Sequence, residues 1–356
     1  MKKIVLTGGG TAGHVTPNIA LLPALQKAGY EITYMGSYDG IEKKLIADFN
    51  IPYVGIATGK FRRYLDLKNF TDPFRVIKGF YEAKKFLKKY MPSVIFSKGG
   101  FVSVPVVRAA SILKIPCIIH ESDMTPGLAN KLCISAAEKV CCNFPETIKL
   151  LPAEKAVLTG SPIRAELSQG NKLAGLNMCS FSANKPVIMV IGGSLGAASV
   201  NKAVRDALPR LLEDYQVVHL CGKNKIDNLL LNTPVYKQFE YIKAELKDLF
   251  AMADIVISRA GANSICELLA LKKPNILIPL PAASSRGDQL LNAQSFEAQG
   301  FSIVINEDDL TPELLVDKVH ELYFNRQNYH DAMSGSGQMD SIQTILRLLE
   351  EVQLPD

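Results

Sequence analysis

The sequence predicts two α/β domains, each built on a doubly wound parallel sheet. Short apolar, β-branched runs alternate with helical patterns along most of the 356 residues, which is typical of a parallel sheet with helices on both faces. A strand, a glycine-rich turn and a helix follow one another twice, in "KIVLTGGGTAGHVTPNIAL" (3–21) and in "PVIMVIGGSLGAASVNKAV" (186–204). The chain is also longer than one hydrophobic core usually supports.

In the first half, apolar runs bounded by turn residues predict six strands, with helical patterns between them. The strands are expected at Ile4–Thr7, Glu31–Met35, Tyr53–Ile56, Val94–Ser97, Cys117–His120 and Lys139–Cys142. The helices are expected at Asn18–Ala28, Ile41–Phe49, Phe74–Lys89 and Val104–Leu113.

The pattern stops at the turn Thr159–Pro162 and restarts near residue 186, which places a hinge at Gly160–Arg164. We therefore expect a first domain over 1–163, a second over 164–340, and an amphipathic helix over 341–356 that returns to the first domain. Further strands of the second domain are predicted at Val217–Leu220, Ile255–Ile257, Ile276–Pro279 and Ile303–Ile305.

The bulk composition excludes several classes of protein. Hydrophobic and charged contents of 47% and 21% are those of a globular protein. Seven cysteines without a C-x-x-C pair or zinc spacing indicate core residues in a reducing cytosol. The lack of a signal peptide and of a long apolar run favours a soluble or peripheral protein. A net charge of +5 is too small to indicate a nucleic-acid partner.

The first glycine turn has the spacing of a dinucleotide site, Gly8-x-Gly10-x-x-Gly13. Such a site needs a carboxylate at the end of the second strand, but that strand ends in Tyr-Met-Gly-Ser and Asp39 lies beyond the turn. His14 also follows the last glycine directly, where a dinucleotide site favours a small residue for close packing of the helix against the strand. The sequence therefore disfavours NAD, and leaves an anion-binding loop or a simple tight turn.

The second domain carries a similar loop at Gly192–Gly196 and two polar segments. In Ser258–Ser264 a loop enters a helix, whose first amides can bind phosphate oxygens. Glu267, one turn later, can accept hydrogen bonds from a vicinal diol or can simply complement the helix dipole. A second polar group contains Asp288, Gln289 and Asn292. These side chains can bind sugar hydroxyls, or they can simply be the solvated start of a helix.

Seven ordered motifs resemble the MurG family of bacterial glycosyltransferases: "GGGTAGHVTP", "KGGFVSVP", "HESD" with "PGLANK", "TGSPIR", "GGSLGA", "SRAGANSICE" and "DQLLNA". The resemblance extends from Lys3 to about Glu350. It implies a GT-B fold, with two Rossmann-like domains facing each other across a cleft. It also implies a hexosyltransferase that moves N-acetylglucosamine (GlcNAc) from UDP-GlcNAc to undecaprenyl-pyrophosphoryl-MurNAc-pentapeptide (lipid I), giving lipid II at the cytoplasmic face of the membrane. No cofactor is implied.

The resemblance also implies site residues. The donor diphosphate and ribose would contact Ser194 and the loop that contains Ala262, Asn263, Ser264, Ile265, Cys266 and Glu267. Uracil would contact the Ile242 backbone, the GlcNAc hydroxyls would contact Asp288 and Gln289, and Arg164 would contact the donor at the hinge. Residues of the first domain that would face the donor sugar or the acceptor are Thr11, Ala12, Gly13, Asp123 and Asn130.

Three positions depart from the commoner family pattern. Asp123 stands where many relatives have Asn, Asp288 where many have Gln, and Ala12 where Gly is common. Both carboxylates keep an acceptor and lose an amide donor. The presence of Asp instead of Asn at position 123 makes the predicted contact of that residue uncertain, but it does not alter the predicted activity.

The implied reaction is an inverting displacement at the GlcNAc anomeric carbon, which needs a base for the muramyl 4-hydroxyl. His14 is the candidate base, and hydrogen bonding without proton transfer is its alternative role. Glu121 is a second candidate, unless it only supports the structure. The chain has no D-x-D motif, so no metal ion is implied.

A basic and aromatic segment suits an anionic membrane surface. Between Lys60 and Met91, ten basic and three acidic residues give a net charge of +7, with aromatic and aliphatic residues interleaved. Such a composition favours peripheral contact with anionic lipid, and a solvated helix face is the alternative. The predicted membrane contacts are Phe70, Phe74 and Ile77.

Four other functions stay open on the sequence alone. A UDP-GlcNAc 2-epimerase shares the fold and the donor, but has no use for a basic, aromatic segment. A transferase acting on another lipid and a non-catalytic sugar-nucleotide sensor are further alternatives. An NAD-dependent dehydrogenase is the least favoured.

Overall fold

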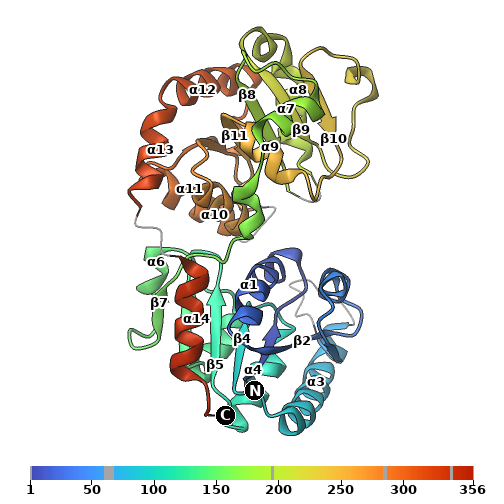
Figure 1. The fold of residues 1–356 in the computed structure, drawn as a ribbon, viewed down its shortest axis with the longest axis vertical. Coiled ribbons are helices and arrows are strands. Elements are labelled where there is room, and N and C mark those ends of the chain that lie inside the picture. Colours follow the sequence, from blue (N-terminus) through green and yellow to red (C-terminus); the bar gives the residue numbers. More distant parts are fainter. Residues whose placement is uncertain (1, 60–67, 194–195, 284–286, 337–339, 356) are drawn as a thin grey trace. The chain divides into compact units, whose positions relative to one another are not determined.

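The computed structural model describes residues 2–59, 68–193, 196–283, 287–336 and 340–355, with only the backbone of 68–73. The chain divides into two compact units (Figure 1). The first contains Met1–Arg164 and Met339–Asp356, and the second contains Ala165–Gln338.

The first unit contains a parallel sheet of seven strands in the order β3-β2-β1-β4-β5-β6-β7. The first six strands in this order along the sheet reproduce the Rossmann arrangement, and β7 extends it. The strands are β1 (Lys3–Thr7), β2 (Glu31–Ser37), β3 (Tyr53–Ile56), β4 (Val94–Ser97), β5 (Cys117–Glu121), β6 (Lys139–Cys142) and β7 (Ala156–Leu158).

Two hydrophobic clusters cover the two faces of this sheet. One joins α1 and α14 to the strands, and the other joins α3, α4 and α5 to them. Strands buried on both faces contain continuous apolar runs, as Ile4–Leu6 of β1 and Cys117–Ile119 of β5 do. The helices are α1 (Thr16–Lys27), α2 (Ile41–Ile46), α3 (Lys68–Tyr90), α4 (Ser103–Ile112), α5 (Leu128–Cys133), α6 (Pro145–Ile148) and α14 (Ser341–Val352).

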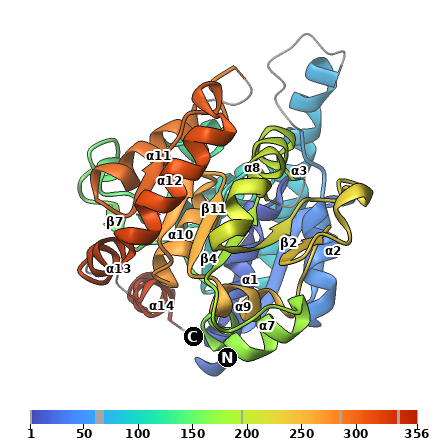
Figure 2. The same cartoon turned by 90° about the horizontal axis from the view of Figure 1, so that it is seen from above.

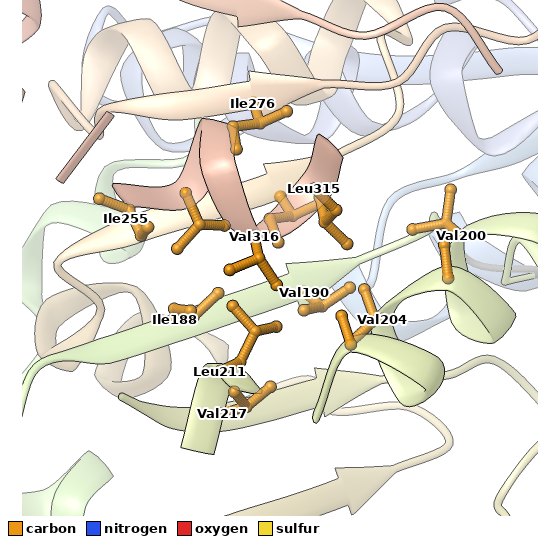
Figure 3. Close-up of a cluster of buried hydrophobic side chains, with 14 of the residues drawn as sticks. Ile188, Val190, Val200, Val204, Leu211, Val217, Ile255, Ile276, Leu315 and Val316 are labelled. Carbon is orange, nitrogen blue, oxygen red and sulfur yellow. The ribbon is translucent and has the colours of Figure 1, made fainter. Parts of the chain in front are cut away.

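The second unit contains a six-stranded parallel sheet, with the complete Rossmann order β10-β9-β8-β11-β12-β13. In its core, Val200, Val204 and Leu211 of α8 meet strand residues such as Ile188, and Leu315 and Val316 come from α12 (Figure 3). The strands are β8 (Val187–Ile191), β9 (Gln216–Leu220), β10 (Tyr236–Phe239), β11 (Ile255–Ser258), β12 (Asn275–Leu277) and β13 (Ser302–Val304).

The green-to-red part of the ribbon contains the helices of the second unit (Figure 2). They are α7 (Lys172–Cys179), α8 (Ala198–Asp214), α9 (Leu246–Met252), α10 (Ala262–Ala270), α11 (Asp288–Ala298), α12 (Pro312–Phe324) and α13 (Arg326–Ser334). One of them, α7, precedes β8, and the others follow β8 or later strands along the chain. Among the described residues, no helix combines the length and the apolar character needed to cross a membrane.

The predicted fold class of two Rossmann-like parallel-sheet domains is confirmed. The sequence did not predict β7 or β10, for physical reasons. β7 has only three residues, all at least partly exposed, and β10 reads "YKQF", with two adjacent polar residues between the aromatic ones. Both are edge strands, which lack the long apolar run of a strand buried on both faces.

The C-terminal helix α14 is part of the first unit (Figure 1). Asp340 caps its N-terminus by accepting a hydrogen bond from the Gln343 amide at 3.1 Å. The buried side chains of Ile345 and Leu349 pack in the cluster with α1. The helix therefore covers one face of the first sheet, although more than 170 residues separate it from the rest of that unit.

We expect Leu349→Ala to lower the free energy of unfolding of the first unit by about 2–5 kcal/mol, because a fully buried leucine leaves a cavity. Urea denaturation followed by circular dichroism measures this loss. Arg347→Ala is the matched control, since that side chain on the same helix is 66% exposed. Equal stabilities of the two variants would contradict the packing of α14 in this core.

Candidate active site

In the first unit, a glycine-rich loop follows β1 at the point where the strand order reverses. Its backbone is held by other parts of the unit. The Tyr34 hydroxyl donates to the Gly8 carbonyl at 2.7 Å, and the Gly9 amide donates to the Gly99 carbonyl at 3.4 Å. The Gly10 amide donates to the Glu42 carboxylate at 3.2 Å. Because two amides already have protein acceptors and one of these is an anion, the loop is not arranged as a phosphate cradle.

The same loop fixes the ring of His14, at the end of a short 3₁₀ turn (Ala12–His14). His14 Nδ1 lies 3.1 Å from the Gly9 carbonyl oxygen and 3.1 Å from Thr11 Oγ1. A carbonyl oxygen can only accept, so Nδ1 carries the proton in the neutral ring. Nε2 is then the nitrogen whose lone pair can take a proton, as a general base requires.

Two glycines after β4 bring further residues to this loop. A Cβ on Gly100 would lie 2.3 Å from the Gly9 oxygen and 3.2 Å from His14 Nδ1, and one on Gly99 would lie 3.1 Å from Asn130 Oδ1. Only glycine allows so close an approach. Asn130, on α5, therefore lies beside Gly99, and His14 lies beside Gly100.

Glu121 is buried at the end of β5, and its carboxylate binds its own loop. Oε1 accepts the amides of Ser122 and Asp123 at 2.8 and 3.1 Å. Oε2 accepts the Gly127 amide at 2.9 Å and the Asn130 side-chain amide at 2.8 Å. Burial raises the pKa of Glu121. With both oxygens engaged, the geometry favours support of the loop over proton transfer.

Lys98 and His120 form a buried pair at the ends of β4 and β5. The sequence did not predict this pair. Lys98 is 1% exposed, and its Nζ contacts His120 Nδ1 at 2.9 Å and Ser122 Oγ. His120 Nε2 donates to the Gly160 carbonyl at 2.9 Å. Burial, and secondarily the Lys98 charge, hold the pKa of His120 well below its ordinary value. A buried, neutral imidazole held by Lys98 and by the Gly160 carbonyl is structural.

In the second unit, the loop after β11 leads through Gly261 into α10. The first helical hydrogen bond runs from the Ile265 amide to the Gly261 carbonyl at 3.1 Å, so the amides of Ala262–Ser264 have no acceptor within the helix. A Cβ on Gly261 would meet no described atom within 4 Å. The amides at the start of α10, the positive end of the helix dipole and the open space at Gly261 together suit an anion. Glu267 lies in the same helix, partly exposed.

Two side chains of α11 hold neighbouring loops in place. The Leu280 amide donates to Gln289 Oε1 at 3.1 Å, so a ligand would meet the NH₂ end of Gln289. Buried Asn292 donates to the Ala260 carbonyl at 3.3 Å and so ties α11 to the loop after β11. Asp288 is the first residue of α11 and is partly exposed.

Arg259 is a site residue to which the sequence analysis gave no role. Its guanidinium is buried and pairs with Glu307. It also donates to the Ile278 carbonyl at 3.0 Å and to Ser199 Oγ at 3.0 Å. One side chain thus joins the loops after β11 and β12 to the start of α8. Because a motif gives residue types and not partners, only the structure shows this role.

The remaining predicted site residues lie in several places. Thr11 is exposed, and Ala12 and Gly13 are partly exposed, in the turn before α1. Arg164 is the last residue of the first unit, and Ile242 lies buried in the loop after β10. Ser194 lies outside the described residues. The backbone of Phe70 lies in α3, and its side chain is also outside the described part; the side chains of Phe74 and Ile77 are exposed.

Family comparisons cover both units. The glycosyltransferase family 28 N-terminal domain matches residues 4–142, and the family 28 C-terminal domain matches residues 187–346. The fold and the paired loops therefore define a glycosyltransferase with two Rossmann-like domains.

Relatives that match over the full length identify the family more closely. The chain is 64% identical over 354 residues to the UDP-N-acetylglucosamine–N-acetylmuramyl-(pentapeptide) pyrophosphoryl-undecaprenol N-acetylglucosamine transferase of Lachnoclostridium phytofermentans, covering 99% of this chain and 100% of that one. It is 63% identical to the Lachnospira eligens enzyme of the same name, with 99% of each covered. The crystal structure of Acinetobacter baumannii MurG matches with a TM-score of 0.79 and 27% identity over 99% of this chain and 100% of that one. The chain belongs to the MurG family.

A second buried histidine makes the stability of the second unit depend on pH. His219 contacts the Tyr236 hydroxyl through Nδ1 at 2.9 Å and Asn201 Oδ1 through Nε2 at 3.0 Å. Burial lowers its pKa to about 3. A histidine in an unfolded chain has a pKa of about 6.5. The unfolded state therefore binds more protons than the folded state between these values.

We expect His219 alone to lower the unfolding free energy of the second unit by about 2 kcal/mol between pH 7 and pH 5. The pKa of His219 is lower in the folded state than in the unfolded state, so its contribution to stability is complete above about pH 6.5 and is lost as the pH falls below that value. Denaturant titrations at the two pH values measure it. His219→Gln should remove that part of the dependence, and His320→Gln, at a side chain 46% exposed, should keep it. An unchanged dependence in His219→Gln would contradict this account.

Proposed function

We propose that this protein transfers GlcNAc from UDP-GlcNAc to the muramyl 4-hydroxyl of lipid I, giving lipid II. Membership of the MurG family supports the activity, since relatives that share up to 64% identity carry the name of that transferase. The observation that carries the chemistry is the His14 ring, whose Nδ1 is bonded to the Gly9 carbonyl so that Nε2 can accept a proton.

The proposed donor site is on the second unit. The amides at the start of α10 would meet the diphosphate, because they point out of a helix end with an open approach at Gly261. Glu267 would accept hydrogen bonds from the ribose hydroxyls, and Gln289 would donate its NH₂ to GlcNAc. Arg259 would hold the surrounding loops without touching the donor.

The proposed reaction is a single displacement with inversion. The muramyl 4-oxygen attacks the anomeric carbon and forms the new glycosidic bond while its proton passes to His14 Nε2. The bond between that carbon and the β-phosphate oxygen breaks, and UDP leaves with the bonding electrons. Amides and the dipole at the start of α10 would stabilise the charge that develops on the leaving group.

We expect His14→Ala to lower kcat by about 10²–10⁴-fold, the usual contribution of a general base, while UDP-GlcNAc affinity stays unchanged. The assay follows radiolabelled UDP-GlcNAc and a short-chain lipid I analogue, with binding measured by calorimetry. His330→Ala, on an exposed helix of the second unit, is the control. Transfer at the wild-type rate in His14→Ala would contradict the assignment of the base.

The same assay separates the alternatives. Donor binding without transfer by the wild-type chain would favour a sensor or another acceptor. Interconversion of UDP-GlcNAc and UDP-ManNAc without an acceptor would favour an epimerase. Transfer of GlcNAc to diacylglycerol and not to the lipid I analogue would favour a transferase for another lipid.

We propose that α3 contacts the membrane surface at which the lipid acceptor lies. Phe74, Ile77 and Tyr81 are 74%, 53% and 64% exposed and recur at helical spacing on one face. Ala83 and Leu87 face the core instead. Exposed cations on α3 that suit anionic headgroups are Arg75, Lys78, Lys85, Lys88 and Lys89.

We expect Phe74→Ser with Ile77→Ser to weaken binding to phosphatidylglycerol vesicles by about tenfold or more, because two apolar side chains lose their burial in lipid. Vesicle co-sedimentation measures this, and UDP-GlcNAc binding should not change. Leu229→Ser is the matched control, since Leu229 is 93% exposed but lies on the second unit. Equal vesicle binding by all three proteins would overturn the proposal.

A further inference from the structure

We infer that Glu42 is a positioning residue whose buried carboxylate acts on His14 through the Gly9–Gly10 peptide group. The kinetic consequence rests on the proposed function, whereas the contacts stand on their own. Glu42 is the second residue of α2 and is 0% exposed. Neither the sequence motifs nor the proposed chemistry assigned it a role.

The carboxylate of Glu42 joins two loops of the first unit. Its Oε1 accepts the Ser37 amide at 2.9 Å and the Ser37 hydroxyl at 2.5 Å, at the end of β2. Its Oε2 accepts the Gly10 amide at 3.2 Å, in the loop after β1. A buried carboxylate is costly unless donors surround it. The three donors compensate that cost and fix both oxygens.

Three glycines make room for this side chain. A Cβ on Gly9 would lie 2.5 Å from Glu42 Cδ, one on Gly36 would lie 2.8 Å from Cγ, and one on Gly40 would lie 2.2 Å from Oε1. Real Cβ atoms do not approach so closely, and here the neighbour is a side chain already held by hydrogen bonds. Gly9 and Gly40 therefore leave room for the carboxylate, and Gly36 leaves room both for Glu42 and for the Tyr53 hydroxyl, which would lie 2.3 Å from its Cβ.

One peptide group connects this carboxylate to the catalytic ring. The amide of Gly10 and the carbonyl of Gly9 belong to the same peptide unit. The amide donates to Glu42, and the carbonyl accepts from His14 Nδ1 at 3.1 Å. A charge on the amide side polarises the peptide and strengthens its carbonyl as an acceptor. Glu42 thus orients His14 and stabilises its protonated form, as a carboxylate does by direct contact in other histidine bases.

The test is Glu42→Gln. In either orientation, the new NH₂ group faces the amide of Ser37 or that of Gly10, so one of the two hydrogen bonds is lost. We expect kcat to fall by about 100-fold, as for a catalytic group displaced by roughly 1 Å, with unchanged UDP-GlcNAc affinity. The acid limb of the pH–rate profile should also move to lower pH, because the nearby negative charge is gone. Asp48→Asn, an exposed carboxylate just after α2, is the control.

Three results would overturn the inference: kcat within twofold of the wild type, a lower kcat with an unmoved acid limb, or the same losses in Asp48→Asn. If Glu42→Gln does not fold, Ser37→Ala removes one of the three donors and should lower kcat by a smaller factor, about tenfold. Wild-type turnover in Ser37→Ala would then overturn it.

Hydrogen exchange of residues 8–15 separates this inference from the proposed function. Glu42→Gln should speed exchange either in that segment or at Ser37, according to which amide loses its acceptor, and should leave β9 unchanged. If the wild type transfers no sugar but the exchange changes as expected, the Glu42 contact stands and the proposed function fails. Unchanged exchange both in residues 8–15 and at Ser37 would overturn the contact itself.

Discussion

In both sheets the strand order reverses between two neighbouring parallel strands, β1 and β4 in the first and β8 and β11 in the second. The loops after those strands leave in opposite directions, which opens a crevice at the carboxyl edge. Two parts of the proposed sites depend directly on this constraint, the loop that carries His14 and the start of α10. It places His14 beside the glycine pair after β4, and it places the start of α10 at the edge of the second sheet.

The loop after β1 and the loop after β11 play different parts in the two units. In the first, the loop amides bind a carbonyl and a carboxylate of the protein, and the loop serves as a mount for an imidazole. In the second, Gly261 leads into a helix whose first amides point outward, and that end suits an anion. The first loop therefore suits the proposed proton acceptor, and the second suits the proposed diphosphate site.

The sequence predicted the fold class because buried parallel strands give continuous apolar runs, and the family motifs indicated the activity. It could not predict Glu42, because the helix Ile41–Phe49 carries no sign that one carboxylate points inward beneath Gly9. Nor could it separate Glu121 from His14, since only hydrogen-bond partners distinguish a braced carboxylate from a ring with an accepting nitrogen. Edge strands such as β7 were missed for lack of an apolar run.

The central proposal is that the nucleotide binds at the start of α10 in the second unit, while the loop after β1 in the first unit carries the base. Hydrogen exchange of the full chain with and without UDP tests it most directly. The account predicts slower exchange in residues 259–267 on adding UDP, and unchanged exchange in residues 8–15. Slower exchange in residues 8–15 with no change in residues 259–267 would contradict it.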